Sequence, residues 1–131
     1  MNEMTGWTPR QRIEHFWQAM NTNDWHAVSA LLHDDYLLVY PQSGERFRGR
    51  EPFIAVNAQY PAAGAWRFTV HRLIADETVV VTEVGVTDGA RTDRVISFFE
   101  FRDGLIWRMT EFWPEPFEAA PWRAHLVEQD Q

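Results

Sequence analysis

One carboxylic acid in this chain stands where it could exchange a proton with a bound molecule. Glu111 lies near the end of a strongly apolar strand pair that runs from Arg94 to Trp113. Burial among apolar side chains raises the pKa of a carboxyl group, which allows it to act as an acid or a base near neutral pH. The alternative is a structural carboxylate held by hydrogen bonds from Tyr40 or from a backbone amide. The residue types leave both interpretations open.

Few other side chains suggest chemistry. His71 lies in a predicted strand, where it is either a base or a surface residue. The histidines do not recur at a metal-ligand spacing such as H-x-x-x-H. The chain has no cysteine, which excludes disulfides, thiol nucleophiles and thiolate metal sites. We therefore expect neither a metal nor a cofactor.

The charge of the chain argues against two classes of partner. The net charge is -7, and the twelve basic residues, all arginine, are scattered along the sequence. Without a basic stripe to neutralise phosphates, we expect no nucleic-acid binding and no attachment to an acidic membrane. No apolar run approaches the roughly 20 residues of a membrane helix, and the N-terminal segment lacks the apolar core of a signal peptide. These features predict a cytoplasmic protein.

The length of 131 residues predicts a single domain over residues 1–131, with a core at about 8–113. The tail, 114–131, is expected to pack on this core. Three helices are expected in the first half of the chain. Thr is a good N-cap and Pro is tolerated at the first helical position, so Thr8-Pro9 predicts the first helix, with an apolar stripe that ends at Met20. The second is expected from Asp24 to about His33–Asp35, and the third from Arg50 to just before Pro61.

Six strands are expected beside these helices. Two short ones span Tyr36–Tyr40 and Phe47–Gly49, and four longer ones span Trp66–Ile74, Thr78–Thr87, Thr92–Phe101 and Leu105–Trp113. Short turns join the long strands, and Asp88-Gly89 is a strong hairpin signal. This order predicts an α+β fold, with three N-terminal helices packed on one face of a strongly curved antiparallel sheet.

The connecting turns assign the faces of the strands. With Arg102-Asp103-Gly104 as a three-residue loop, Val95 lies opposite Glu111 and Ser97 opposite Met109, all facing the helices. Phe99, Trp107 and Met109 are expected to line that face, and Asp93 is a further candidate there.

Two other strands need separate treatment. With Asp88-Gly89 as a two-residue loop, Glu83 lies outside and opposite Arg94, which predicts a cross-strand ion pair. For the strand Trp66–Ile74, either Thr69 and His71 or Phe68 and Val70 face inward.

The outer face of the sheet also carries apolar residues. Ile96, Phe98 and Phe112 point away from the helices, and Ile106 is expected there too, where an ordinary antiparallel sheet would be polar. A second subunit is the simplest cover for these side chains. We therefore expect a homodimer packed through the outer sheet face.

Several short motifs occur in an order that is typical of one superfamily. They are Asn23-Asp24-Trp25, the segment from Leu31 to Tyr36, the segment from Phe47 to Glu51, and Phe101 to Ile106 followed by Glu111-Phe112-Trp113. Over about residues 8–113 this arrangement resembles the nuclear-transport-factor-2-like superfamily, which includes SnoaL-like polyketide cyclases and steroid delta-isomerases. The resemblance implies a cone-shaped fold with a deep, mostly apolar interior pocket. Because the fold hosts both enzymes and binding modules, it does not specify a reaction.

The resemblance also allows two reactions to be tested against the sequence. Steroid isomerases place a tyrosine, a protonated aspartic acid and an aspartate base in the pocket. By local motif, these positions fall on Phe16, Ser97 and Tyr40, and none of the three supplies the needed chemistry. An epoxide-hydrolase-like Asp–Arg–Asp set is not expected either, because Asp93 and Arg94 are adjacent on a strand and point to opposite faces.

The candidate site therefore has one catalytic residue, Glu111, within a ligand-binding set. That set comprises Phe16, Met20, Tyr40, Val56, Asn57, Ser97, Phe99, Met109 and Trp113. Asn57 could orient a ligand carbonyl or simply bond to Tyr40. We expect a SnoaL-like protein that binds a small, largely apolar molecule. As an enzyme it would be a cofactor-independent isomerase or cyclase that uses Glu111; the alternative is a dimeric binding module without catalysis.

Overall fold

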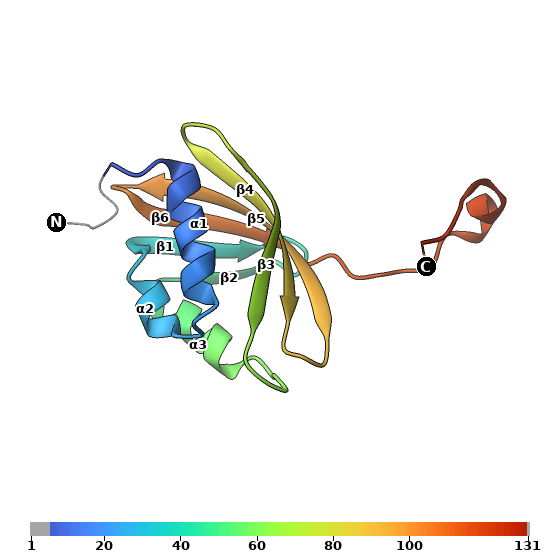
Figure 1. Cartoon of the computed structure of the whole chain (residues 1–131), viewed down its shortest axis with the longest axis horizontal. Helices are drawn as coiled ribbons and strands as arrows, with labels where there is room; N and C mark the ends of the chain where they lie inside the picture. The colour runs from blue at the N-terminus through green and yellow to red at the C-terminus, as the bar shows by residue number, and fades with distance from the viewer. Residues whose placement is uncertain (1–5, 131) are drawn as a thin grey trace.

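The computed structural model describes residues 6–130, in which three helices lie against a six-stranded sheet (Figure 1). The helices are α1 (Pro9–Met20), α2 (Trp25–Ser29) and α3 (Arg50–Gln59). The strands are β1 (Leu32–Tyr40), β2 (Glu45–Arg48), β3 (Arg67–Ala75), β4 (Val79–Thr87), β5 (Thr92–Arg102) and β6 (Leu105–Phe112). The predicted α+β fold is confirmed, and the four long strands lie within two residues of their predicted bounds. No helix among these residues has the length and apolarity needed to cross a membrane.

Helix α1 begins as the sequence predicts. The Thr8 hydroxyl accepts a hydrogen bond from the Gln11 backbone N–H at 3.1 Å, and the Gln11 side chain accepts one from the Thr8 backbone N–H at 2.9 Å. This reciprocal pair satisfies two donors that a helix start leaves free. The helix crosses the inner face of the sheet and buries four apolar side chains there: Ile13, Phe16, Trp17 and Met20.

Helix α2 is shorter than predicted, and the strand that follows begins earlier. Asp24 caps the helix by accepting a hydrogen bond from the Ala27 backbone N–H at 3.0 Å. The helix ends at Ser29, and β1 starts at Leu32 rather than Tyr36. The predicted helix end at His33–Asp35 is wrong because Leu32 pairs with Ile106 of β6, which draws this segment into the sheet.

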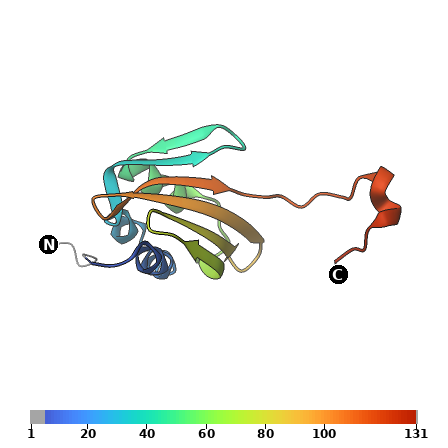
Figure 2. The ribbon, with the colours of Figure 1, turned by 90° about the horizontal axis from the view of Figure 1, so that it is seen from above.

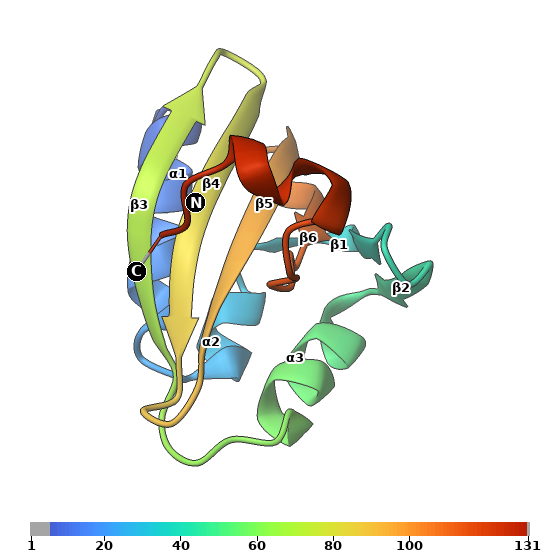
Figure 3. The same ribbon diagram turned by 90° about the vertical axis from the view of Figure 1, so that its right-hand side faces the viewer.

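The strands of the sheet lie in the order β2-β1-β6-β5-β4-β3. All neighbours are antiparallel except β1 and β6, which run parallel. The last strand of the chain therefore lies inside the sheet, and β2 and β3 form its two edges. The long strands curve around α1, and the sheet stays open (Figure 3).

The connection between β4 and β5 is longer than the predicted two-residue turn. Thr87 pairs with Thr92, which leaves four residues, 88–91, in the loop. Asp88 organises it, because its side chain accepts hydrogen bonds from the backbone N–H groups of Ala90 and Arg91, both at 2.9 Å. A hydrogen bond from the Ala63 backbone N–H, together with those from Arg91 and Ala90, lowers the pKa of Asp88 to about 2.

The longer loop changes the register between β4 and β5. A different residue therefore lies opposite Glu83, but Glu83 remains on the outer face of the sheet. Glu83 lies opposite Ile96 rather than Arg94. The predicted ion pair is nevertheless confirmed, because Arg94 reaches Glu83 diagonally with a separation of 2.6 Å between charged atoms. Arg72 of β3 also pairs with Glu83, and both arginines help to lower the pKa of this carboxyl group.

The inner face of the sheet is covered by the helices, whereas apolar side chains on the outer face remain partly exposed. On the inner face, beneath the helices, Val80, Val84, Val95 and Phe99 are completely or almost completely buried. On the outer face Phe98 remains 39% exposed and packs edge-on against Phe112, with ring centres 6.1 Å apart.

The sequence predicts that the C-terminal segment packs on the domain, but in the structure the segment extends away from it. Residues 114–130 run away from the end of β6 and include a short 3₁₀-helix, η1 (Pro121–Leu126) (Figures 1 and 2). Pro114 and Pro116 account for the extended course, because each fixes its own φ and disfavours a helical conformation in the residue before it.

Candidate functional site

The turn between β5 and β6 decides what lies beside Glu111. Asp103 and Gly104 both have positive φ angles, 55° and 75°, so two residues rather than the predicted three connect Arg102 to Leu105. Ser97, instead of Val95, lies directly opposite Glu111. The Ser97 hydroxyl donates a hydrogen bond to Glu111 Oε2 at 3.0 Å.

The shorter turn displaces the pairing of β5 with β6 by one residue from the predicted register. A β-bulge at Trp107 displaces it by one residue more. Glu100 pairs with Arg108 and Phe101 pairs with Ile106, so Trp107 has no residue opposite it. The total shift of two residues keeps Ser97 and Glu111 on the same inner face. Two predictions fail at the bulge: Ile106 is turned inward and is 3% exposed, and Trp107 is not part of the cavity wall.

The guanidinium groups of Arg102 and Arg108 lie 3.9 Å and 4.4 Å from the Trp107 ring centre, as in cation–π contacts. These contacts explain how a large aromatic side chain is accommodated outside the core.

Glu111 combines burial with few compensating hydrogen bonds. It is 7% exposed, and burial raises its pKa from 4.5 to about 7. The hydrogen bond from Ser97 and the proximity of the Trp113 indole N–H lower the pKa, but by less than burial raises it. The carboxyl group is therefore close to half-protonated at neutral pH, which suits both donation and acceptance of a proton.

Two further polar groups lie beside this carboxyl group. Trp113 Nε1–H is buried, and no acceptor within residues 6–130 meets hydrogen-bond geometry with it, although it lies close enough to affect the pKa values of Glu111 and Tyr40. Burial, with Glu111 nearby, raises the pKa of Tyr40 well above its usual value, so its hydroxyl keeps its proton. The site thus offers two donors, one from an indole and one from a phenol.

These groups meet at a cavity of about 50 Å³ between α1, α3 and the inner sheet face. Its walls are mostly apolar, and its polar members are Tyr40, Asn57, Glu111 and Trp113. Ligand pockets commonly measure roughly 300–1,000 Å³. In this conformation the cavity accommodates a few waters or one end of a small molecule, and a planar polycyclic molecule needs side-chain movement to enter.

Most of the sequence-predicted residues surround this cavity. Seven contribute directly to its wall: Phe16, Met20, Tyr40, Asn57, Met109, Glu111 and Trp113. Ser97 lies behind Glu111, and Phe99 lies behind Phe16, with ring centres 5.4 Å apart. Val56 is not a wall residue. The Asn57 amide donates to the Phe53 carbonyl at 2.9 Å within its own helix, so the alternative of a bond to Tyr40 is not the one observed.

Five further wall residues lie outside the predicted ligand-binding set: Trp17, Leu38, Phe53, Phe68 and Val95. Of these, the sequence places Val95 on the inner face and leaves Phe68 as one of two alternatives for its strand. Tyr36 was also overlooked; it is fully buried, and its hydroxyl lies 3.0 Å from Met109 Sδ. The signal was available, because Tyr36, Leu38 and Tyr40 alternate along β1 and so share a face.

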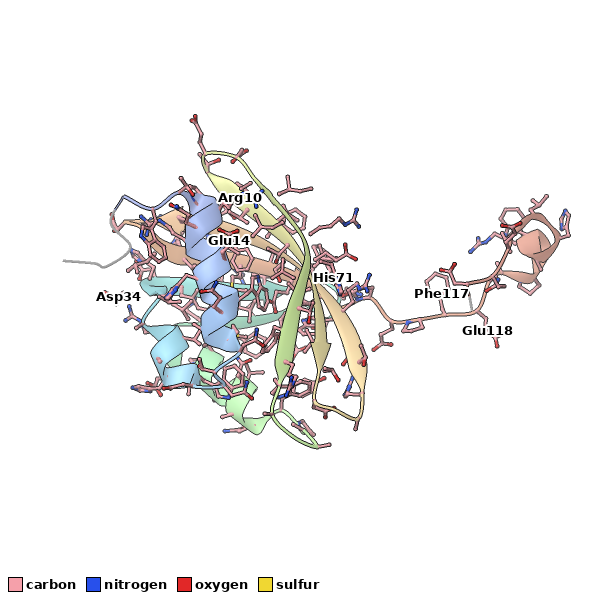
Figure 4. The ribbon with its side chains drawn as sticks, viewed as in Figure 1. Arg10, Glu14, Asp34, His71, Phe117 and Glu118 are labelled. Carbon is pink, nitrogen blue, oxygen red and sulfur yellow. The ribbon has the colours of Figure 1, made fainter. Side chains whose placement is uncertain are left out.

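The two remaining polar candidates lie away from the cavity. His71 is at a bulge in β3 and covers Gly85 on the outer face, where an added Cβ would come within 2.7 Å of its Nε2 (Figure 4). Phe68 is the β3 residue at the cavity. Asp93, near the start of β5, pairs with Arg91 at 2.8 Å. Within residues 6–130, no three His, Asp or Glu side chains are grouped as metal ligands.

The fold and the cavity define a cone-shaped α+β protein with an interior carboxyl group. The SnoaL-like domain family model matches residues 13–109, and the chain belongs to this family. A search of curated proteins gives no significant match.

Solved structures agree with this assignment. A putative ketosteroid isomerase from Kribbella flavida is 37% identical, with a TM-score of 0.83 over 93% of this chain and 89% of its own. An NTF-2 like protein of unknown function from Burkholderia xenovorans is 33% identical, with a TM-score of 0.74 over 93% and 94% of the two chains. A putative polyketide cyclase from Xanthomonas campestris is 26% identical, with a TM-score of 0.63 over 80% and 92%.

Proposed function

We propose that the chain binds a small, largely apolar carbonyl compound in the cavity and that Glu111 exchanges a proton with it. The observation that carries this proposal is a buried carboxyl group in a mostly apolar cavity wall, where burial raises its pKa to about 7. Acids and bases are most effective when their pKa lies near the working pH. The names of the isomerase and cyclase neighbours support the same class of reaction.

The proposed step needs no cofactor. The Glu111 carboxylate removes a proton from the carbon next to the carbonyl group, and the electron pair of the broken C–H bond moves toward the carbonyl oxygen. Tyr40 and Trp113 supply donors for the negative charge that develops on that oxygen. Where a carbon–carbon double bond is conjugated with the enolate, the electron pair extends to its far carbon, and return of the proton from Glu111 to that carbon moves the double bond and completes an isomerisation.

Deuterium exchange tests this step without a known substrate. Two ketones, cyclohexanone and 2-tetralone, are incubated with the protein in D₂O, and loss of their C–H signals is followed by NMR. Because general acid–base catalysis contributes about 100- to 10,000-fold, Glu111→Gln should reduce the exchange by at least about 100-fold. Glu100→Gln is the matched control, since Glu100 lies on an exposed part of β5.

The outcomes separate two functions. Exchange that survives in Glu111→Gln would reject the role of Glu111. The second candidate function, binding without catalysis, is favoured by the single carboxyl group in the cavity wall. It predicts no exchange by the wild-type protein, together with a shift of the Trp113 Nε1–H signal when the ketone is added.

A further inference from the structure

The C-terminal arm, defined here as residues 114–130, presents apolar side chains to solvent. Phe117 is 84% exposed, Trp122 is 71% exposed and Leu126 is 69% exposed. Phe117 and Glu118 lie well away from the sheet (Figure 4). Monomeric proteins rarely expose so many large apolar groups in one segment without a binding partner.

The direction of the arm is fixed close to its origin. Pro114 and Pro116 hold the first residues after β6 in an extended conformation, with Glu115 between them. At about 3.1 Å per residue, this places Phe117 roughly 12 Å beyond Trp113. The arm is therefore directed outward, away from the apolar surface of its own domain (Figure 2).

The outer face of the sheet carries a matching apolar patch. We define the outer patch as Ile74, Val81, Ile96, Phe98 and Phe112, which alternation and register place on this face. Ile74 is 67% exposed and Phe98 is 39% exposed. The patch is close to the sequence-predicted dimer surface, and the structure extends it across β3 and β4.

Charge around the outer patch is complementary to charge on the arm. The register places six arginines on this face: Arg46, Arg48, Arg67, Arg72, Arg94 and Arg108. Of the carboxylates on the same face, Glu83 is bound by Arg72 and Arg94, and Glu100 lies opposite Arg108. The arm carries four carboxylates, Glu115, Glu118, Glu128 and Asp130, against one arginine, Arg123.

We propose that the chain forms a homodimer in which each C-terminal arm packs across the outer patch of the second copy. The arm supplies Phe117, Trp122 and Leu126 to the apolar centre, and its carboxylates meet the arginine rim. A groove between α1 and β3 is another partly apolar surface, but it carries Glu14 as well as Arg10 and is therefore less positive than the outer face, which makes it the poorer site for an acidic segment. This proposal is independent of any reaction in the cavity.

Sedimentation velocity on full-length variants tests the role of the arm. Phe117→Asp combined with Trp122→Asp should weaken dimerisation by at least tenfold. Val70→Asp is the matched control, because Val70 is 40% exposed but lies in the groove beside α1. A wild-type monomer at tens of micromolar, or an unaltered dimer in the double variant, would overturn the proposal.

Crosslinking tests where the arm docks. The chain has no cysteine, so a disulfide can form only between the introduced cysteines. Glu118→Cys protein mixed with Thr110→Cys protein should form a mixed disulfide, since Thr110 lies opposite Phe98 on the outer face. Glu118→Cys mixed with Gln18→Cys, on the groove side of α1, should not.

Two crosslinking results would contradict this docking mode. A crosslink to Gln18 in place of Thr110 would assign the arm to the groove. A Glu118→Cys/Thr110→Cys double variant that closes within one chain at high dilution would show that the arm folds back on its own domain.

Discussion

At the scale of single residues, Glu111 links stability to pH. Burial raises its pKa in the folded protein to about 7, from 4.5 for a glutamate side chain in water. Between these two pH values, the Glu111 carboxyl group is therefore mostly protonated in the folded protein and mostly ionised in the unfolded chain. The resulting stabilisation is complete below about pH 4.5 and is lost as the pH rises through 7.

Replacement of Glu111 by Gln should remove this dependence. A shift of this size corresponds to roughly 3 kcal/mol between about pH 4 and pH 8. Urea unfolding at both pH values measures this effect. Relative to wild type, the free energy of unfolding of Glu111→Gln should rise by that amount between the lower and the higher pH. An equal difference at the two pH values would mean that Glu111 has an ordinary pKa.

The sequence predicts the inward face of Glu111 but not its partner. Alternation is sufficient to assign a face, and an error of two residues in register leaves that face unchanged. The partner depends on the turn and the bulge. Asp103-Gly104 suits a two-residue turn, yet Arg102-Asp103-Gly104 fits a three-residue loop equally well by residue type. The folded structure distinguishes them: Arg102 pairs with Leu105, and the bulge leaves Trp107 without a residue opposite it.

At the scale of elements, Arg50 joins three parts of the chain. From the first turn of α3, its guanidinium donates to the carbonyl oxygens of Ser29 (3.0 Å) and Leu32 (2.6 Å) and to the Asp34 carboxylate (2.6 Å). These bonds hold the end of α2 and the start of β1 against α3. The sequence predicts the start of α3 at Arg50, but the two carbonyl partners become close only in the folded chain.

Arg50→Lys should therefore destabilise the fold although it keeps the positive charge. A lysine ammonium cannot reproduce the planar arrangement of donors that serves three acceptors. We expect a loss of about 2 kcal/mol in the free energy of unfolding, measured in urea. Arg48→Lys, at an exposed position on β2, is the control and should change stability little. Equal effects in the two variants would contradict the role of Arg50.

At the scale of the whole molecule, the position of each strand in the sheet should set its local stability. β5 has a neighbour on both sides, whereas β2 is a four-residue edge strand paired only with β1. Amide hydrogen exchange should therefore be slowest in β5 and fastest in β2 among the strands. Exchange in β2 as slow as in β5 would indicate that another surface covers this edge.

The overall fold class was more predictable than its connectivity. Helix caps and alternating apolar residues are local signals, and they located most of the elements. The parallel pairing of β1 with β6 joins residues such as Leu38 and Met109, and no local signal encodes a contact of this range. The course of the arm was mispredicted because Phe117 and Trp122 look like core residues by type, while Pro114 and Pro116 direct them outward.

The central position of β6 also has a consequence for synthesis on the ribosome. Until this strand emerges, β1 and β2 form one small ladder and β3, β4 and β5 form another, with no strand to join them. Each part then exposes an additional sheet edge and an uncovered apolar face, which are the usual starting points of aggregation. The nascent chain must therefore remain soluble until residues 105–112 have left the ribosome, because only then can its sheet be completed.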